Sequence, residues 1–184
     1  NAAGQEPDAK GASSPTVIDT FCGAGGLSLG LELAGFETVL GADYWRAAHD
    51  TWLRNHASPF LLEDLSQCSV QDLLSAAKRS EAPTVFAGGP PCQGFSSAGS
   101  RRHDDSRNTL VAKFGHLAVE MQAPFVIFEN VEGFLTWQDG NALTSLLETL
   151  VAGGYACRVA KVNAANYGAP QLRKRVIVLA GLGL

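Results

Sequence analysis

Seven short apolar runs alternate along the chain with longer segments that mix apolar and polar residues. The apolar runs predict strands near residues 16–21, 37–42, 59–62, 84–87, 124–129, 156–163 and 175–182. The mixed segments predict helices near 26–35, 45–55, 69–79, 108–122 and 140–152. Because strands and helices alternate, the pattern favours an α/β fold with a mostly parallel sheet covered on both faces. A long loop without a predicted helix joins the last two strands, which allows that pair to run antiparallel.

The composition narrows the class of protein. With 184 residues and 46% hydrophobic content, the chain suits one domain with its own core. No run approaches the roughly 20 apolar residues of a membrane span, and no signal peptide is visible, so we expect an intracellular protein. Residues 1–15, rich in Ala, Gly, Ser and Pro, are expected to form a disordered tail before a domain at 16–184.

Cysteine and histidine spacing indicates no metal site. The four cysteines are far apart and include no Cys-x-x-Cys pair, so neither a zinc site nor a disulfide framework is predicted. The four histidines, His49, His56, His103 and His116, have no metal-ligand spacing with another candidate ligand. We expect each histidine at the surface or in the core.

A candidate nucleophile, Cys92, follows the predicted strand 84–87 and comes directly after two prolines. Open α/β sheets place their chemistry at the carboxyl ends of strands, and proline would fix the backbone that aims the thiol. A lone cysteine is more often a small buried apolar residue. The surrounding pattern favours the nucleophile, because Glu129 ends the next apolar run and Arg173 and Arg175 lead into the last one. These groups could converge on one edge.

A glycine-rich turn follows the first predicted strand and leads into a helix; it contains Phe21, Gly23, Gly25 and Gly26. Glycine lets the backbone approach a ligand closely, and the helix amino terminus offers free N–H groups, so the turn suits a nucleotide-like cofactor. Its spacing differs from the dinucleotide fingerprint and from a phosphate-binding loop. A turn of this kind can also be a simple connection.

Two acidic residues come after the next two predicted strands. Asp43 lies about 20 residues past the glycine turn, the separation at which an acidic side chain meets ribose hydroxyls in such sheets. Asp64 follows the apolar run at 60–62 and could contact an adenine amino group. Either residue could instead cap the helix that follows it.

Several segments together resemble the cytosine-5 DNA methyltransferases. They are DTFCGAGG at 19–26, GPPCQGFS at 89–96, ENV at 129–131 and QLRKR at 171–175, with DSRNTL at 105–110 and NAANYGAP at 163–170 as intervening blocks. Their order and spacing match the family over about residues 16–182. The resemblance implies a Rossmann-like class I methyltransferase fold, with a mostly parallel seven-stranded sheet and an antiparallel last strand. It also implies S-adenosylmethionine as cofactor and cytosine in DNA as methyl acceptor.

The resemblance also implies residue roles. Cys92 would add to carbon 6 of cytosine, Glu129 would hold or protonate ring nitrogen 3, and Arg173 and Arg175 would contact the base oxygen or order a loop. The base would have to rotate out of the duplex, and the polar loop 93–108 could close over it, or be an ordinary surface loop. Cofactor binding is implied for Asp19, Phe21, Gly23, Gly25, Gly26, Leu27, Asp43, Tyr44, Asp64, Leu65 and Pro90, and substrate binding for Pro91, Gln93, Ser96, Arg107, Asn130 and Val131.

The chain departs from the family at its carboxyl end. Members usually continue into a target-recognition domain and a returning helix, so we expect a second polypeptide or a further segment to carry them. The net charge of −4 and a pI near 5.5 predict weak DNA binding by this chain alone. A split enzyme should then expose an apolar face. Alternatives are methylation of cytosine in transfer RNA and a cofactor-binding module without turnover. The resemblance places the protein in a bacterial cytoplasm, or in a nucleus if eukaryotic.

Overall fold

The computed structural model describes residues 14–91 and 108–184 and contains a seven-stranded sheet in the order β3-β2-β1-β4-β5-β7-β6. The first five strands are parallel, and β7 runs antiparallel to both β5 and β6. This arrangement confirms the predicted α/β class and the antiparallel last strand. The strands are β1 (Thr16–Thr20), β2 (Glu37–Asp43), β3 (Phe60–Leu62), β4 (Val85–Gly88), β5 (Phe125–Val131), β6 (Tyr155–Asn163) and β7 (Lys174–Leu182).

The helices lie close to their predicted positions. They are α1 (Gly26–Leu33), α2 (Arg46–Asn55), α3 (Val70–Ala76), α4 (Asn108–Met121) and α5 (Asn141–Ala152), with short 3₁₀ turns η2 (Glu132–Leu135), η3 (Trp137–Gly140) and η4 (Ala164–Tyr167). The predicted helix at 69–79 is shorter at both ends. Ser69 caps α3 in a capping box with Asp72, and Lys78 ends it in a left-handed conformation with φ 53°.

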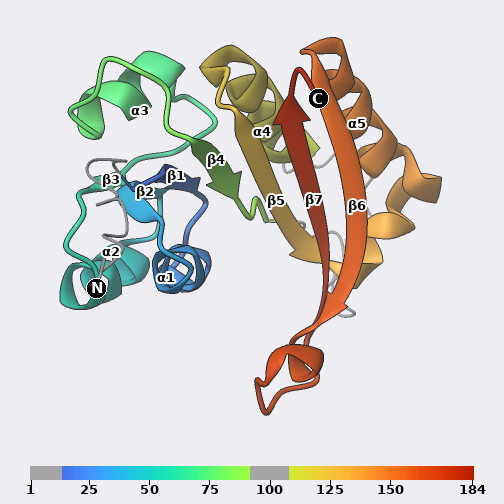
Figure 1. The fold of residues 1–184 in the computed structure, drawn as a ribbon, viewed down its shortest axis with the longest axis horizontal. Helices are drawn as coiled ribbons and strands as arrows, with labels where there is room; N and C mark the ends of the chain where they lie inside the picture. The colour runs from blue at the N-terminus through green and yellow to red at the C-terminus, as the bar shows by residue number, and fades with distance from the viewer. Residues whose placement is uncertain (1–13, 92–107) are drawn as a thin grey trace, which may run out of the picture.

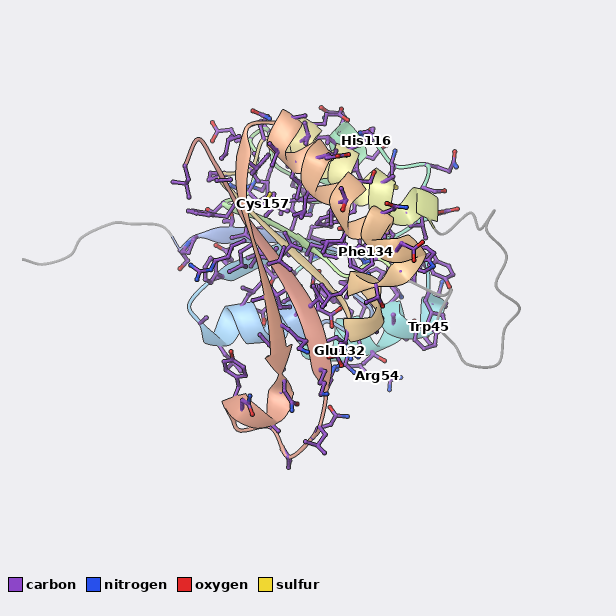
Figure 2. All side chains as sticks on the ribbon, turned by 90° about the vertical axis from the view of Figure 1, so that its right-hand side faces the viewer. Trp45, Arg54, His116, Glu132, Phe134 and Cys157 are labelled. Atoms are coloured by element: carbon purple, nitrogen blue, oxygen red, sulfur yellow. The ribbon has the colours of Figure 1, made fainter. Side chains whose placement is uncertain are left out.

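One face of the sheet carries most of the core, beneath α3, α4 and α5. Phe114 of α4 stacks on Phe86 of β4 with ring centroids 5.3 Å apart and lies 5.5 Å from Phe128 of β5. Phe134 of η2 is fully buried between α5 and the sheet (Figure 2). The Tyr155 hydroxyl lies 3.2 Å from the Ala118 carbonyl and 2.9 Å from the Ala123 carbonyl. This contact joins β6 to the end of α4.

Among the described residues, helices cover the opposite face over only half of its width. Figure 1 shows α1 and α2 beside the β1–β3 half of the sheet, whereas α4 and α5 both accompany β5, β7 and β6. A groove of about 590 Å³ therefore runs over the free face of β5, β7 and β6, and its lining includes Phe125, Ile127, Leu179 and Leu184. Phe125 is 47% exposed and Leu179 46% exposed. The prediction that both faces are covered was wrong for this half, because the β6–β7 connection brings no long helix to cover it.

Candidate active site

The predicted site residues that the structure describes gather at one edge of the sheet. The carboxyl ends of parallel β1 to β5 all lie at this edge, and antiparallel β7 begins there. The edge carries the glycine turn after β1, Asp43 at the end of β2, Pro90 after β4, Glu129 near the end of β5 and Arg175 near the start of β7. Open α/β sheets bind their ligands at such an edge.

The glycine turn between β1 and α1 is held by backbone and carboxylate contacts. The Gly23 N–H donates to Asp43 Oδ2 at 2.9 Å, and the Gly25 N–H donates to the Cys22 carbonyl at 3.0 Å. Gly23 and Gly25 have φ values of 54° and 90°, a region that favours glycine. Gly25 is the N-cap of α1, so the free N–H groups of the first helical turn begin at this point.

Asp43 serves both the turn and the start of α2. While Oδ2 accepts from Gly23, Oδ1 accepts from the Trp45 N–H at 3.0 Å. Trp45 is the N-cap of α2 and has no side-chain cap of its own. The capping alternative for Asp43 is therefore half right, since Asp43 holds the N–H directly before the helix and also fixes the glycine turn.

Asp19 lies beneath the turn with one carboxylate oxygen unpartnered. Its Oδ2 accepts a 2.6 Å hydrogen bond from Ser28 Oγ of α1, whereas Oδ1 is buried without a hydrogen-bond partner among the residues that the structure describes. Burial raises the pKa of Asp19 to about 7, although the Ser28 hydrogen bond opposes the rise. A buried oxygen of this kind has room for one more donor, so the site fits a ligand that brings an ammonium or hydroxyl group.

The acidic and basic candidates meet where β5 and β7 pair. Glu129 Oε1 lies 2.8 Å from Arg175 Nε and 3.9 Å from an Arg173 terminal nitrogen. Val131 is the register partner of Arg175, and Glu129, two residues earlier, lies on the same face of the sheet. A Cβ on Gly89 would lie 3.2 Å from Glu129 Oε2, so the second oxygen faces the segment that follows β4.

Asn130 joins that segment to the sheet. Its Nδ2 donates to the Pro90 carbonyl at 3.1 Å, and its Oδ1 accepts from the Val131 N–H at 2.8 Å. The residue is only 4% exposed. The Asn130 side chain thus positions the prolines that lead to residue 92, and its expected contact with the substrate stays a prediction.

The remaining predicted residues are distributed as follows. Pro91 is the last residue described before the gap, and Cys92, Gln93, Ser96 and Arg107 lie outside the described residues, as does most of the loop 93–108. Asp64 is exposed and accepts from the Ser66 N–H at 2.9 Å, so it does not cap α3, which Ser69 caps. Leu65 is buried in the core, Phe21 and Leu27 are half-buried beside the turn, and Tyr44 is exposed.

Two residues at the site had no sequence signal beyond their general type. Ser28 binds Asp19 from nine residues away in the chain, and His56 packs against Gly25 from the end of α2. The only prediction from the sequence that concerned His56 was that each histidine lies in the core or at the surface.

Within residues 14–91 and 108–184, no group of three or more His, Cys, Asp or Glu side chains could hold a metal ion. No helix in these ranges has the length and hydropathy needed to cross a membrane.

Comparison with known proteins gives a consistent set of similarities. The family model of C-5 cytosine-specific DNA methylases matches residues 15–182. The type II methyltransferase M.HgiDI of Herpetosiphon aurantiacus is 38% identical over 163 residues, which span 89% of this chain and 51% of the relative. M.AquIA of a Picosynechococcus strain is 33% identical over 174 residues, which span 89% of this chain and 70% of the relative.

Solved structures agree with the sequence matches. A DNA modification methyltransferase encoded within an E. coli prophage is 34% identical, with a TM-score of 0.82 over 92% of this chain and 47% of that protein. The S. pombe Dnmt2 methyltransferase shares the fold at 20% identity and a TM-score of 0.75, over 94% of this chain and 51% of that protein. The chain spans between 38% and 51% of the first three curated relatives, or roughly half their length.

Proposed function

Because this chain belongs to the C-5 cytosine-specific DNA methylase family, we propose that it catalyses methyl transfer from S-adenosylmethionine to carbon 5 of cytosine in DNA. The observation that carries the proposal is the cluster of Glu129, Arg173 and Arg175 at the carboxyl edge of the sheet. It faces the proline segment that leads directly to Cys92 and lies on the same edge as the glycine turn. An acid, two cations and a thiol at one edge of the sheet would suit addition to a cytosine ring.

The cofactor would occupy the glycine turn and the strand ends beside it. S-adenosylmethionine supplies a methyl group activated by a sulfonium. Asp19 would accept a hydrogen bond from its amino-acid part through the unpartnered Oδ1, and the first N–H groups of α1 would hold its carboxylate. Asp43 and Asp64 would receive the hydroxyl and amino groups of the nucleoside. Gly23 and Gly25 keep the backbone open for this approach.

The chain's own residues would activate the base. The Cys92 thiolate forms a bond to carbon 6, which makes carbon 5 nucleophilic, and Glu129 stabilises the charge at ring nitrogen 3 through a shared proton. After methylation, a base takes the proton from carbon 5, the freed electron pair re-forms the double bond between carbons 5 and 6, and the Cys92 sulfur leaves carbon 6 as a thiolate. Arg175 holds Glu129 through Oε1, which leaves Oε2 for the base. Arg173, half-exposed at the same carboxylate, is suited to the base oxygen or the DNA backbone.

Access of the base to this edge would require base flipping. An atom inside a stacked duplex is out of reach, and extrusion costs a few kcal/mol. The segment that would replace the lost stacking is the loop after Cys92, with Arg101, Arg102 and Arg107 as its cations. The proposal that this loop closes over DNA rests on its sequence, since it lies outside the described residues.

A second polypeptide or a further segment would supply target recognition. The free apolar face over β5, β7 and β6 supports this part of the proposal, because sheets of this class are normally covered on both faces. Charge supports it as well, since a net charge of −4 provides few cations for phosphate contacts. Replacing Phe125 and Leu179 with Ser should reduce self-association of the chain in light scattering. An unchanged particle size distribution would argue against an exposed docking face.

Covalent trapping tests the catalytic proposal. The chain is incubated with S-adenosylmethionine and duplex DNA that carries 5-fluorocytosine, which cannot lose its substituent from carbon 5, and intact mass is measured. We expect an adduct that maps to Cys92 and is absent in Cys92→Ser. Cys157→Ser, which changes a cysteine on β6, is the matched control and should leave the adduct unchanged.

Three outcomes separate the alternatives. An adduct on transfer RNA but not on DNA would replace the DNA substrate with RNA. Cofactor binding without any adduct, even when the C-terminal half of a relative is supplied in trans, would indicate a binding module. An adduct on a residue other than Cys92 would refute the assignment of the nucleophile.

A further inference from the structure

His56 lies behind the glycine turn, at a position that the proposed chemistry does not use. It is the C-cap residue of α2, and its N–H donates to the Trp52 carbonyl at 2.8 Å. Its side chain is only 2% exposed. A histidine buried at a helix end needs partners for its ring, and these partners come from α2 itself and from the neighbouring helix α1.

The ring is fixed by an indole and a carboxylate. The His56 imidazole stacks on the Trp52 indole with centroids 4.1 Å apart and planes inclined by 25°. His56 Nδ1 lies 3.3 Å from Glu32 Oε1, which joins the end of α2 to α1, and Figure 1 shows these two helices side by side. Trp52 cannot move easily, because it is fully buried, donates from Nε1 to the Ser58 carbonyl at 2.9 Å, and fills the space beside Gly41.

The free edge of the ring presses on the glycine turn. A Cβ on Gly25 would overlap His56 Nε2 and would lie 2.9 Å from both Cδ2 and Cε1. Gly25 is therefore required for two reasons, its φ of 90° and the imidazole that occupies the place of a side chain. The other side of the same turn is held by the hydrogen bond from the Gly23 N–H to Asp43. The turn thus lies between a carboxylate and a histidine.

We propose that His56 is a positioning residue for cofactor binding: its ring, held by Trp52 and Glu32, fixes Gly25 and so sets the direction of the N–H groups that begin α1. The inference rests on the proposed function, in which this turn holds S-adenosylmethionine. Other ionisable side chains around the turn are Asp19 of β1, Cys22 in the turn itself and Asp43 of β2, and Glu32 of α1 contacts the imidazole.

His56→Ala tests the inference, with His49→Ala as the matched control. His49 lies on the same helix, 5.2 Å from Phe60 by ring centroids, and its Nδ1 contacts neighbouring Asp50 rather than the turn. We expect the dissociation constant for S-adenosylmethionine, measured by calorimetry, to rise about tenfold in His56→Ala and to stay unchanged in His49→Ala. Millimolar imidazole should restore affinity in His56→Ala by refilling the space, a rescue that general destabilisation would not show.

Hydrogen exchange provides a readout that needs no cofactor. In the ligand-free chain, amides at 23–27 should exchange about tenfold faster in His56→Ala, while amides in α5 keep their rates. Equal exchange at 23–27 in the parent and in His56→Ala would overturn the inference. The inference would also be overturned if His56→Ala were less stable than the parent but bound S-adenosylmethionine with unchanged affinity. If the parent itself binds no S-adenosylmethionine, the proposed function fails, and the exchange experiment alone decides whether His56 positions the turn.

Discussion

Asp19→Asn should stabilise the ligand-free chain at neutral pH while weakening cofactor binding. The parent buries a carboxyl whose pKa is raised from 3.8 to about 7, chiefly by burial. Below about pH 4 the carboxyl is protonated in both the folded and the unfolded chain. As pH rises towards 7, the unfolded chain loses this proton first. The contribution of the protonated Asp19 carboxyl to the free energy of unfolding therefore falls, and it is lost above the pKa that Asp19 has in the folded chain.

The expected magnitude follows from the separation of the two pKa values. A difference of about 3 pH units corresponds to roughly 4 kcal/mol, an upper estimate for one buried group. Asparagine is neutral throughout, and its Oδ1 can still accept the hydrogen bond from Ser28. The free energy of unfolding of Asp19→Asn, relative to the parent, should therefore increase by up to about 4 kcal/mol between pH 4 and pH 8.

Urea unfolding followed by tryptophan fluorescence measures this difference at several pH values. Asp50→Asn is the control, because Asp50 is an exposed carboxyl whose pKa is lowered by its hydrogen bond with His49. Calorimetry of the same variants should show weaker S-adenosylmethionine binding only in Asp19→Asn. If the free energies of unfolding of the parent and Asp19→Asn changed in parallel with pH, the claim that burial raises the pKa of Asp19 would be refuted.

Three further substitutions test other parts of the site and the fold. Arg175→Lys removes the 2.8 Å contact to Glu129 and should slow formation of the 5-fluorocytosine adduct at least about tenfold without changing cofactor affinity; an equal rate would remove Arg175 from this role. Asp43→Ala removes the acceptor for the Gly23 N–H and should weaken cofactor affinity by a modest factor, with unchanged affinity leaving only a structural role. Tyr155→Phe leaves two buried carbonyls without the hydroxyl and should lower the free energy of unfolding by about 1–3 kcal/mol in urea, with cofactor affinity intact.

Local signals in the sequence predicted most elements and the edge on which the site lies. Apolar runs placed all seven strands within about one or two residues, and the glycine and proline positions marked the turns after β1 and β4. Where a helix was shorter than predicted, a nearby side chain set its limit. Ser69, for example, is the N-cap of α3 and makes a capping box with Asp72. The candidate residues Asp43, Glu129 and Arg175 could be placed at one edge because strands and helices alternate along the chain, and this alternation implies a mostly parallel sheet.

The sequence by itself therefore determined the α/β class, the places of the strands and helices, and which polar residues follow which strand. Only the tertiary structure decided that α4 and α5 share one face and leave Phe125 and Leu179 uncovered on the other. It alone brought Asn130 to the Pro90 carbonyl and His56 to Gly25, across 40 and about 30 residues of chain. The physical reason is that hydrophobic periodicity and turn residues act over one element, whereas these contacts depend on strand order and on which face each crossover helix takes.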